Sequence, residues 1–327
     1  MLSRRRFITA TAATLGAAVT RSSAFAQGAR LPARPIKIVV PFAAGGGVDV
    51  YARMLADKIS KQTGASFVVD NRGGGSGTIG GNAVRTADAD GTTLLFSAAT
   101  HVMSKHVLKS APYDPLTDFA PVARVGEAPM LLVMAPDRKP ASIKELIAAI
   151  KAEPDKWTFG TAALGAPGHI ATIGFNQASG LATKILPYRG TAPALNDVAG
   201  GHIQLLIDPV LALLPMAKEK KVIGLAVTSG KRTRLAPDIP TAAESGLAGF
   251  DHASWYGFWG PKALPADLVA TLSQAIGAAV KELDGEGKLA QLGIEPVIEG
   301  PQAFQAFAAK YVARNAELLK AAKFEPV

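Results

Sequence analysis

Glycine turns at the starts of helix-like segments carry the residues of this chain that are best suited to binding a small anion. The clearest turn is Gly45-Gly46-Gly47, which follows the apolar, strand-like run Ile36–Val40 and precedes a helix-like segment that starts at Asp49. Glycine lets the backbone approach a ligand closely. The first turn of a helix also presents unpaired N–H groups at the positive end of the helix dipole. We therefore predict an anion site whose donors are backbone groups.

Two further glycine turns and one polar strand end extend this prediction. The turns span residues 73–81 and 165–168, and the polar strand end spans residues 97–101. Ligands of parallel α/β sheets bind beyond the carboxyl ends of the strands, so we expect these loops to face a ligand. Asp49 is a residue type that also caps helices, which leaves its own role open between capping and ligand binding.

The literal G-x-G-x-x-G pattern at Gly75–Gly80 raises the alternative of a dinucleotide site. It lies in the second strand–helix unit rather than the first, and no acidic residue ends the following strand. Gly45–Gly47 lacks the lysine of a phosphate-binding P-loop. Ser76 lacks the second glycine of a nucleophile elbow. We therefore expect neither a nucleotide cofactor nor a serine nucleophile.

Metal and thiol chemistry has little support in the sequence. The chain contains no cysteine, which removes disulfides, cysteine-ligated metals and thiol catalysis. Its five histidines show no H-x-x-x-H spacing and form no tract with carboxylates. We expect no metal, no cofactor and no catalytic residue.

The positive charge of the chain is spread rather than clustered. The formal net charge of the 327 residues is +9, and four of the positive charges are Arg4, Arg5, Arg6 and Arg21. The remaining charges form no long basic run and no aromatic–basic motif, so we expect no nucleic-acid binding. A mildly basic surface is suited to gathering acidic small molecules.

Residues 1–26 have the features of an export signal. Arginines at positions 4–6 precede Phe7 and an alanine-rich apolar stretch, and Ala24-Phe25-Ala26 fits a cleavage site. The paired arginines favour a twin-arginine signal over an ordinary secretory signal, and both stay open. No later stretch is long and apolar enough to span a membrane. We expect a mature, exported protein that starts near Gln27.

From residue 36 onward, strand-like and helix-like segments alternate, which is typical of an α/β fold with right-handed crossovers. The pattern restarts near residue 130 without a flexible linker, so we expect two domains joined by strands that cross between them. Two amphipathic segments near the C-terminus, Pro265–Leu283 and Pro301–Lys323, have no strand of their own and should pack on one of the sheets. The expected division is a signal peptide at 1–26, domain 1 at 27–128 and 250–327, and domain 2 at 129–249.

A series of short motifs runs in order along the mature chain. They are Arg34–Asp49, Val68–Arg72, Asp90–Leu95, Thr100-His101, Pro187–Gly190, Pro193–Leu195, Leu225–Ser229, Pro240–Gly246 and Trp255–Gly257. The series covers essentially the whole mature chain and resembles the Bug/TctC-type substrate-binding proteins of tripartite tricarboxylate transport systems. The chain departs from the common family pattern at Ala44, where a proline is frequent, and at Gln204, where an aspartate is usual.

The resemblance implies an α/β, two-domain periplasmic binding protein (type II-like), each domain a mostly parallel sheet flanked by helices, with the ligand cleft between them. It implies a non-catalytic protein that captures a small carboxylate: a di- or tricarboxylate, an acidic amino acid or an aromatic carboxylate. The loop at Phe42–Asp49 would hold one carboxylate, and the turn at residues 161–169 would hold the distal end. The ligand would pass to membrane permease subunits, and we expect the binding protein to be a monomer in the periplasm.

The candidate ligand-binding residues lie in these loops at strand ends. They are Phe42, Gly46, Gly47, Asp49, Gly77, Thr78, Ser97, Thr100, His101, Thr161, Gly165, His169 and Asp208. Two other functions stay open, an exported cofactor-dependent enzyme and a binding protein that serves a sensory receptor.

Overall fold

The computed structural model describes residues 30–327, so the expected signal peptide at 1–26 lies outside the described residues. The strands are β1 (Ile36–Val40), β2 (Phe67–Asn71), β3 (Thr93–Ala98), β4 (Phe119–Met134), β5 (Thr158–Thr161), β6 (Lys184–Pro187), β7 (Leu205–Pro209), β8 (Ile223–Val227), β9 (Ala253–Pro261) and β10 (Glu295–Glu299). The helices are α1 (Gly47–Thr63), α2 (Thr78–Arg85), α3 (Thr100–Val107), α4 (Ile143–Ala152), α5 (Pro167–Ser179), α6 (Thr191–Ala199), α7 (Val210–Lys218), α8 (Ala266–Gly285), α9 (Lys288–Gln291) and α10 (Pro301–Ala321), with short 3-10 turns at Gly75–Gly77 and Pro154–Lys156.

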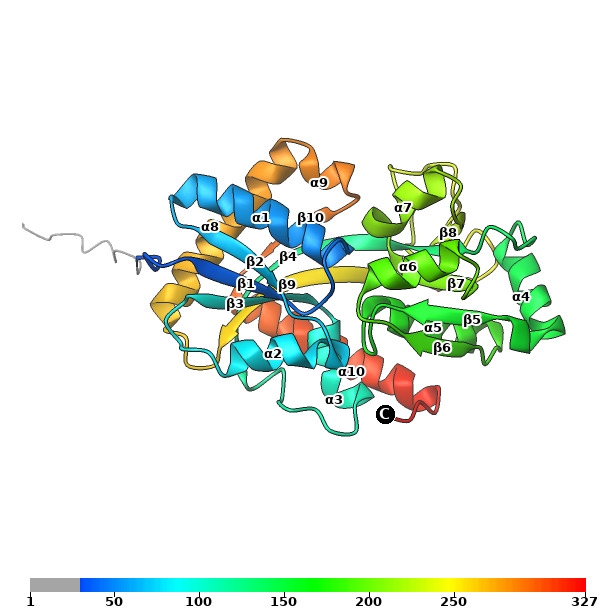
Figure 1. Ribbon diagram of the computed structural model, residues 1–327, viewed down its shortest axis with the longest axis horizontal. Helices are drawn as coiled ribbons and strands as arrows, with labels where there is room; N and C mark the ends of the chain where they lie inside the picture. The colour runs from blue at the N-terminus through cyan, green and yellow to red at the C-terminus, as the bar shows by residue number, and fades with distance from the viewer. Residues whose placement is uncertain (1–29) are drawn as a thin grey trace, which may run out of the picture.

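The strands form one continuous sheet whose two halves build two lobes (Figure 1). The strand order is β2-β1-β3-β9-β4-β7-β5-β6, and β8 and β10 also pair with β4. Strands β1, β2 and β3 are parallel to one another in the first lobe, as are β5, β6 and β7 in the second. Among the described residues, no helix is long and apolar enough to cross a membrane.

Strand β4 connects the two lobes. Its residues 119–129 pair with β9, and its residues 130–134 pair with β7 and β8. The apolar run of the sequence indicates a strand only at Met130–Ala135. The part of β4 before that point contains Pro121 and Pro129, and proline cannot donate to a sheet ladder. The β4–β9 register shifts between Pro121 and Ala123, and such an irregularity accommodates a proline within the ladder.

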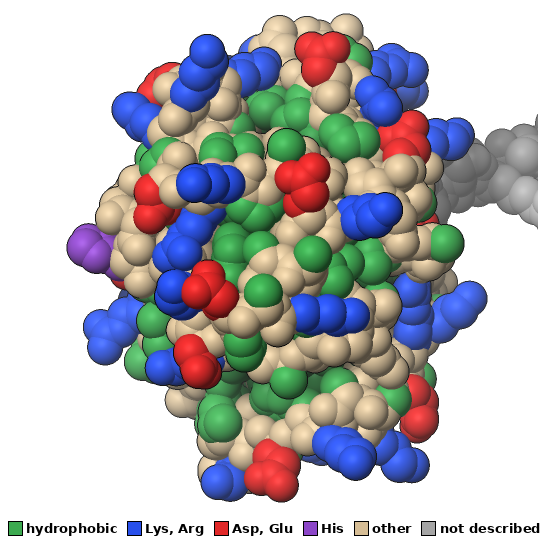
Figure 2. Space-filling model, turned by 90° about the vertical axis from the view of Figure 1, so that its right-hand side faces the viewer, with side chains coloured by type: hydrophobic (Ala, Val, Ile, Leu, Met, Phe, Trp, Pro, Cys, Tyr) green, Lys and Arg blue, Asp and Glu red, His purple; other side chains and the backbone are tan. Residues whose placement is uncertain are grey.

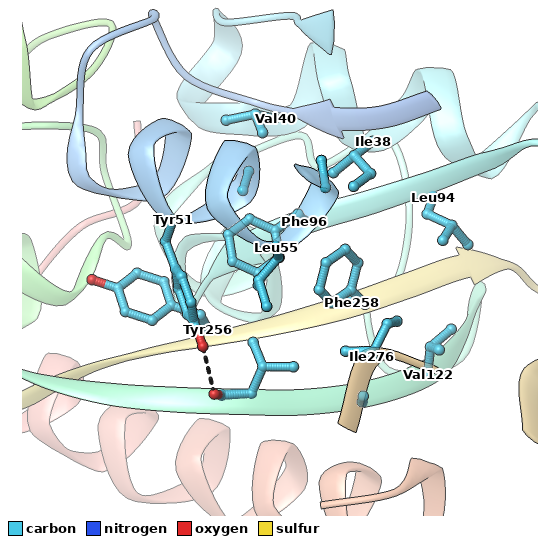
Figure 3. Close-up of a cluster of buried hydrophobic side chains, with 14 of the residues drawn as sticks. Ile38, Val40, Tyr51, Leu55, Leu94, Phe96, Val122, Tyr256, Phe258 and Ile276 are labelled. Atoms are coloured by element: carbon cyan, nitrogen blue, oxygen red, sulfur yellow. Dashed lines mark hydrogen bonds between the residues drawn. The ribbon is translucent and has the colours of Figure 1, made fainter. Parts of the chain in front are cut away.

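The first lobe packs helices on both faces of its half-sheet. Successive side chains of β9 point to opposite faces of the sheet, as in any strand. Tyr256 and Phe258 pack toward α1 and α8, while Trp255 and Trp259 pack toward α3 and α10. Figure 3 shows the first of these clusters, in which Tyr51 of α1 lies against Tyr256. Helix α1, which carries the glycine turn at its start, is therefore fixed to the centre of the half-sheet.

The second lobe repeats this arrangement around β4, β7 and β5. Met130 and Leu132 of β4 face a cluster that includes residues of α4 and α5. Leu131 and Val133 face the opposite cluster with α6 and α7. Both faces of the half-sheet are covered, which holds the starts of α5, α6 and α7 in place.

The expectation that the C-terminal segments contain no strand is wrong. Strand β10 lies between α8 and α10 and pairs antiparallel with β4. Its sequence, Glu-Pro-Val-Ile-Glu, carries a proline and two glutamates, residue types that are depleted in strands. The residue types of this segment do not indicate a strand. Its pairing with β4 depends instead on tertiary packing, in which α8 and α10 flank it.

We predict that Tyr51→Phe lowers the free energy of unfolding by about 1–2 kcal/mol, because it removes a hydrogen bond and leaves a buried carbonyl without a partner. The Tyr51 hydroxyl donates to the Val125 carbonyl oxygen at 2.8 Å, the bond drawn in Figure 3. Urea unfolding followed by far-ultraviolet circular dichroism measures the difference. Tyr256→Phe is the matched control, because the neighbouring Tyr256 hydroxyl has no hydrogen-bond partner among the described residues. Equal losses in the two variants would contradict the assignment.

Candidate functional site

The cleft lies where the two lobes meet, and helix starts from both lobes supply most of its lining. Five helices begin at or beside it, namely α1 and α3 of the first lobe and α5, α6 and α7 of the second. The lining residues are Phe42, Gly46, Gly47, Val48, Asp49, Ala98, Thr100, Ala162, Ala166, Pro167, Thr191, Asp208, Pro209 and Ser254.

The first lobe presents the glycine turn before α1. Gly45 adopts a φ of 84°, a conformation that favours glycine, and Gly46 is the extended N-cap residue of the helix. The N-cap makes no side-chain hydrogen bond, so the first N–H groups of α1 are not capped by their own N-cap residue. This turn therefore offers backbone donors to the cleft.

Asp49 holds this turn in shape. Its carboxylate accepts hydrogen bonds from the Gly45 N–H at 2.9 Å and from the Asn71 side-chain amide at 2.9 Å, and it pairs with Arg53 at 3.0 Å. Burial alone would raise the pKa of Asp49, but the hydrogen bonds from Arg53, Gly45 and Asn71 together hold it below its usual value. Asp49 lies in the first turn of α1 rather than at its N-cap, where the sequence suggested it. Its charge is compensated by groups within its own lobe.

The second lobe brings α5 unusually close to β7. A Cβ atom at Gly168 would overlap the Ile207 carbonyl oxygen, so a larger residue there would push the helix start away from the strand. Asp208 follows Ile207 at the end of β7, and Pro209 is the N-cap residue of α7. The close packing places Asp208 beside the first turn of α5.

A direct backbone contact closes the two lobes over the cleft. The Ala43 N–H, in the glycine turn of the first lobe, donates to the Arg189 carbonyl oxygen of the second at 3.1 Å. The next residue, Gly190, has a φ of 138°, and a Cβ atom on it would lie 3.2 Å from the Ala43 nitrogen. Glycine at this position allows the contact, so the described conformation is one with the lobes together.

The charges around the cleft are one-sided. Among the described residues, Asp49 and Asp208 are the only ionisable side chains in the lining, and no lysine or arginine lines it. Asp208 is 3% exposed, and its Oδ2 atom has no hydrogen-bond partner in the described part of the chain. Burial raises the pKa of Asp208 to about 7, and the nearby Thr191 hydroxyl opposes that shift only in part.

Several buried hydroxyl groups beside the cleft also lack partners within residues 30–327. Thr100 and Ser254 line the cleft directly, while Ser97 and Tyr256 lie on the adjoining strands β3 and β9. Buried polar atoms in proteins are nearly always hydrogen-bonded. This cluster of hydroxyls and the lone Asp208 oxygen is therefore suited to polar atoms of a ligand or of ordered water.

The structure brings six of the thirteen sequence-predicted residues into the lining. These are Phe42, Gly46, Gly47, Asp49, Thr100 and Asp208. The other seven, which lie outside it, are Gly77, Thr78, Ser97, His101, Thr161, Gly165 and His169.

The residues outside the lining have contacts of their own. The His169 Nδ1 accepts the Gly165 N–H at 3.0 Å, and the Thr161 hydroxyl donates to the Ala163 carbonyl oxygen at 3.2 Å, so both support the turn before α5. His101 is buried against Phe119 and Trp259.

Thr191 and Ser254 were absent from the predicted site. Thr191 is the first residue of α6, so the rule that helix starts bind anions points to it. Ser254 lies in an aromatic strand, and only its polarity among apolar neighbours sets it apart. In the described part of the chain, no group of three or more histidine and carboxylate side chains could hold a metal ion.

Comparisons with known proteins give a consistent result. A family model described as "Tripartite tricarboxylate transporter family receptor" matches residues 51–324. The chain is 35% identical to protein BugT of Bordetella pertussis over 291 residues, which is 88% of this chain and 89% of that protein. These matches confirm the family resemblance seen in the sequence.

Solved structures agree with this family and with the fold. The periplasmic binding protein BugD is 36% identical with a TM-score of 0.86, covering 90% of this chain and 100% of that one. R. palustris Rpa4515 with adipate is 35% identical with a TM-score of 0.87, covering 90% and 99%. MatC from Rhodopseudomonas palustris with bound malate is 27% identical with a TM-score of 0.83, covering 88% and 100%. The predicted periplasmic binding protein fold is confirmed.

We predict that Asp208→Asn stabilises the ligand-free protein at pH 8 by roughly 2–4 kcal/mol and has little effect near pH 4. The pKa of Asp208 is raised from 3.8 to about 7 on folding. Because folding raises the pKa of this carboxyl, ionising it destabilises the folded protein. This penalty is absent below the pKa of the unfolded state, grows as the pH rises, and is complete above the pKa of the folded state. Urea unfolding of both proteins between these pH values measures the difference.

Asp49→Asn provides the control with the opposite sign. The pKa of Asp49 is lowered, so its ionised form contributes stability that is present at neutral pH and lost in acid. Asp49→Asn should therefore destabilise the protein at pH 8. If Asp208→Asn also destabilised the ligand-free protein at pH 8, the description of Asp208 as an uncompensated buried carboxyl would be wrong.

Proposed function

Since the chain belongs to the family of tripartite tricarboxylate transporter receptors, we propose that its cleft captures a small dicarboxylate. The family consists of transport receptors, which are binding proteins rather than enzymes. The chain is accordingly a solute-binding protein of the periplasmic type. The relatives crystallised with adipate and malate support a dicarboxylate as the ligand class here.

The convergence of five helix starts on a cleft without cationic side chains is the observation that carries this proposal. Each helix start stabilises an adjacent negative charge by roughly 0.3–2 kcal/mol through its dipole and unpaired N–H groups. A phosphate or nucleotide site would ordinarily add a lysine or arginine, and the lining residues of the described chain include neither. Fixed backbone dipoles suit the smaller charge of a carboxylate.

We place the two carboxylates of the ligand at opposite sides of the cleft, one against each lobe; these two sides are called its jaws below. One would accept N–H groups of Gly46 and Gly47 and the hydroxyl of Thr100, which line the cleft on the first lobe. The other would accept N–H groups at the starts of α5 and α6, near Thr191. A chain of methylene groups would lie against Phe42 and the apolar residues between them. A monocarboxylate would leave one jaw unfilled.

Movement of the lobes about β4 and β9 would admit and enclose the ligand, in the manner of hinged binding proteins. The proposed domains are residues 27–128 with 250–327, and residues 129–249. The Ala43–Arg189 contact joins these two parts and would break on opening. That hydrogen bond contributes about 1 kcal/mol to the closed state, and apolar packing between the lobes, such as that of Leu211 against the start of α1, adds to it.

We further propose export through a cleaved, twin-arginine-like signal peptide at residues 1–26 and delivery of the ligand to permease subunits by a monomer. The surface is compatible with small-molecule transport. Figure 2 shows acidic and basic side chains interspersed with apolar ones over the free end of the second lobe, without a large basic patch on that face. A basic patch would be the footprint of nucleic-acid binding.

The proposal predicts that the mature protein binds linear dicarboxylates, and that Gly46→Leu abolishes binding up to about 1 mM ligand. A side chain at Gly46 would extend from a point 3.7 Å from the Thr191 side chain, so leucine would fill the space between the jaws. Isothermal titration calorimetry against dicarboxylates, tricarboxylates, acidic amino acids, aromatic carboxylates and nucleotides measures both effects.

Gly285→Leu is the control for Gly46→Leu. A Cβ atom on Gly285 meets nothing within 4 Å, so this leucine should leave both folding and binding unchanged. Binding of a nucleotide in place of every carboxylate would overturn the proposed function, as would unchanged dicarboxylate binding by a folded Gly46→Leu protein.

A further inference from the structure

We propose that Asp208 is the specificity-determining hydrogen-bond donor of the cleft, and that capture of a fully ionised dicarboxylate therefore takes up one proton. The proposal rests on the proposed function, since it concerns the same cleft and ligand class. It assigns Asp208 a neutral carboxyl in the complex. The proton comes from solvent and forms an O–H bond on the carboxylate of Asp208, with no other bond made or broken.

The position of Asp208 requires it to face the ligand. It is the last residue but one of β7, lines the cleft and is 3% exposed. Its Oδ2 atom is buried and has no hydrogen-bond partner among residues 30–327. An unpartnered oxygen of this kind has a large desolvation cost unless a bound molecule or a proton satisfies it.

Among the described residues, no cationic side chain balances Asp208, and burial raises its pKa even though the starts of α5 and α7 lie beside it. On β9, Ser254 and Tyr256 present hydroxyl groups, and burial raises the pKa of Tyr256, which keeps its phenol neutral. On α6, Thr191 contributes a hydroxyl. On β4, the residue paired with Asp208 is the apolar Leu131.

The remaining elements around the cleft are also neutral or already paired. On α5, burial lowers the pKa of His169 to about 4, so its ring carries no charge at neutral pH. On α7, Leu211 is apolar, and the basic residue Lys218 lies in the last turn, away from the cleft. Across the cleft, Asp49 is negative but is paired with Arg53 in its own lobe.

The cleft thus combines helix starts suited to anion binding with a buried carboxyl group that no cationic side chain of the described lining compensates. Two unit charges about 5 Å apart in such a partly buried site weaken binding by on the order of a hundredfold. Protonating Asp208 at pH 8 lowers the affinity for the ligand only about tenfold, because burial already raises the pKa of this group to about 7. Proton uptake therefore costs less affinity than repulsion, and it turns Asp208 into a donor for a ligand oxygen.

The chemistry of the ligand decides between two states of Asp208. An ionised linear dicarboxylate such as succinate, glutarate or adipate offers only hydrogen-bond acceptors, so Asp208 must donate. A ligand with a hydroxyl or ammonium group aimed at Asp208 could instead donate to an ionised carboxylate. The site should consequently prefer unsubstituted dicarboxylates at lower pH.

Proton uptake is measured directly by mixing the mature protein with succinate, glutarate or adipate in weakly buffered solution under a pH-stat. We expect close to one proton per bound ligand at about pH 8.5, and an uptake that falls towards zero below about pH 6, where Asp208 is already protonated. In calorimetric titrations, the dissociation constant should rise roughly tenfold between pH 7 and pH 8.5. This readout needs no variant.

Variants then assign the proton to Asp208. Asp208→Asn carries a permanent neutral donor, so it should bind the dicarboxylate with no proton uptake and with an affinity that stays constant over this pH range. Asp49→Asn is the matched acid-to-amide control. It should retain the proton uptake of the wild type even where its affinity differs, because the pKa of Asp49 lies below its usual value and this group stays ionised throughout.

The outcomes separate this inference from the proposed function. Dicarboxylate binding without proton uptake, together with weaker binding by Asp208→Asn at every pH, would overturn the inference and leave the proposed function intact. The same proton uptake in Asp208→Asn as in the wild type would also overturn it. Failure of the wild-type protein to bind any carboxylate between pH 6 and pH 8.5 would overturn both.

Discussion

Helix starts can bind an anion without cationic side chains only if several of them are held close together, and this constraint organises the protein. Five helices begin around one cleft, and none of the described lining residues is a lysine or arginine. A helix dipole acts only over its first turn, so small displacements of a helix would lose the interaction. The packing of both lobes therefore serves to fix the positions of these first turns.

The sheet supplies that fixation. Strands β4 and β9 pair across the middle of the molecule, and every helix that starts at the cleft packs on one half of the sheet or the other. The glycines at positions 168 and 190 then permit two close approaches, one of α5 to β7 and one between the lobes. Asp49 completes the first jaw by holding its turn from within the same lobe. Asp208 is different, because no cationic side chain among the described lining residues lies beside it, and its carboxyl group is buried in the lining of the cleft.

Much of the fold could be predicted from the sequence, because local signals and tertiary packing agree over most of the chain. The run Ile36–Val40, the glycine turn after it and the helix that follows were all visible as patterns. Strand β10 and the first part of β4 were not, since their prolines and glutamates contradict strand propensity and only pairing with distant strands holds them in the sheet.

The site was harder to predict. Gly46 and Gly47 could be identified because a glycine turn before a helix is recognisable from the local sequence, and helix starts bind anions. His101 and His169 were predicted because they lie in loops at strand ends, yet both are buried outside the lining, and His169 accepts the Gly165 N–H. Ser254 reaches the cleft only because β9 passes beneath it.

The central claim is that backbone N–H groups of helix starts, and not cationic side chains, bind the carboxylates. A crystal structure of the mature protein with a bound dicarboxylate tests this most directly. We expect one carboxylate within about 2.7–3.2 Å of the N–H groups of Gly46 and Gly47, and the other at the same distance from the first N–H groups of α5 or α6. A carboxylate bound by a lysine or arginine side chain, or a ligand bound outside this cleft, would contradict it.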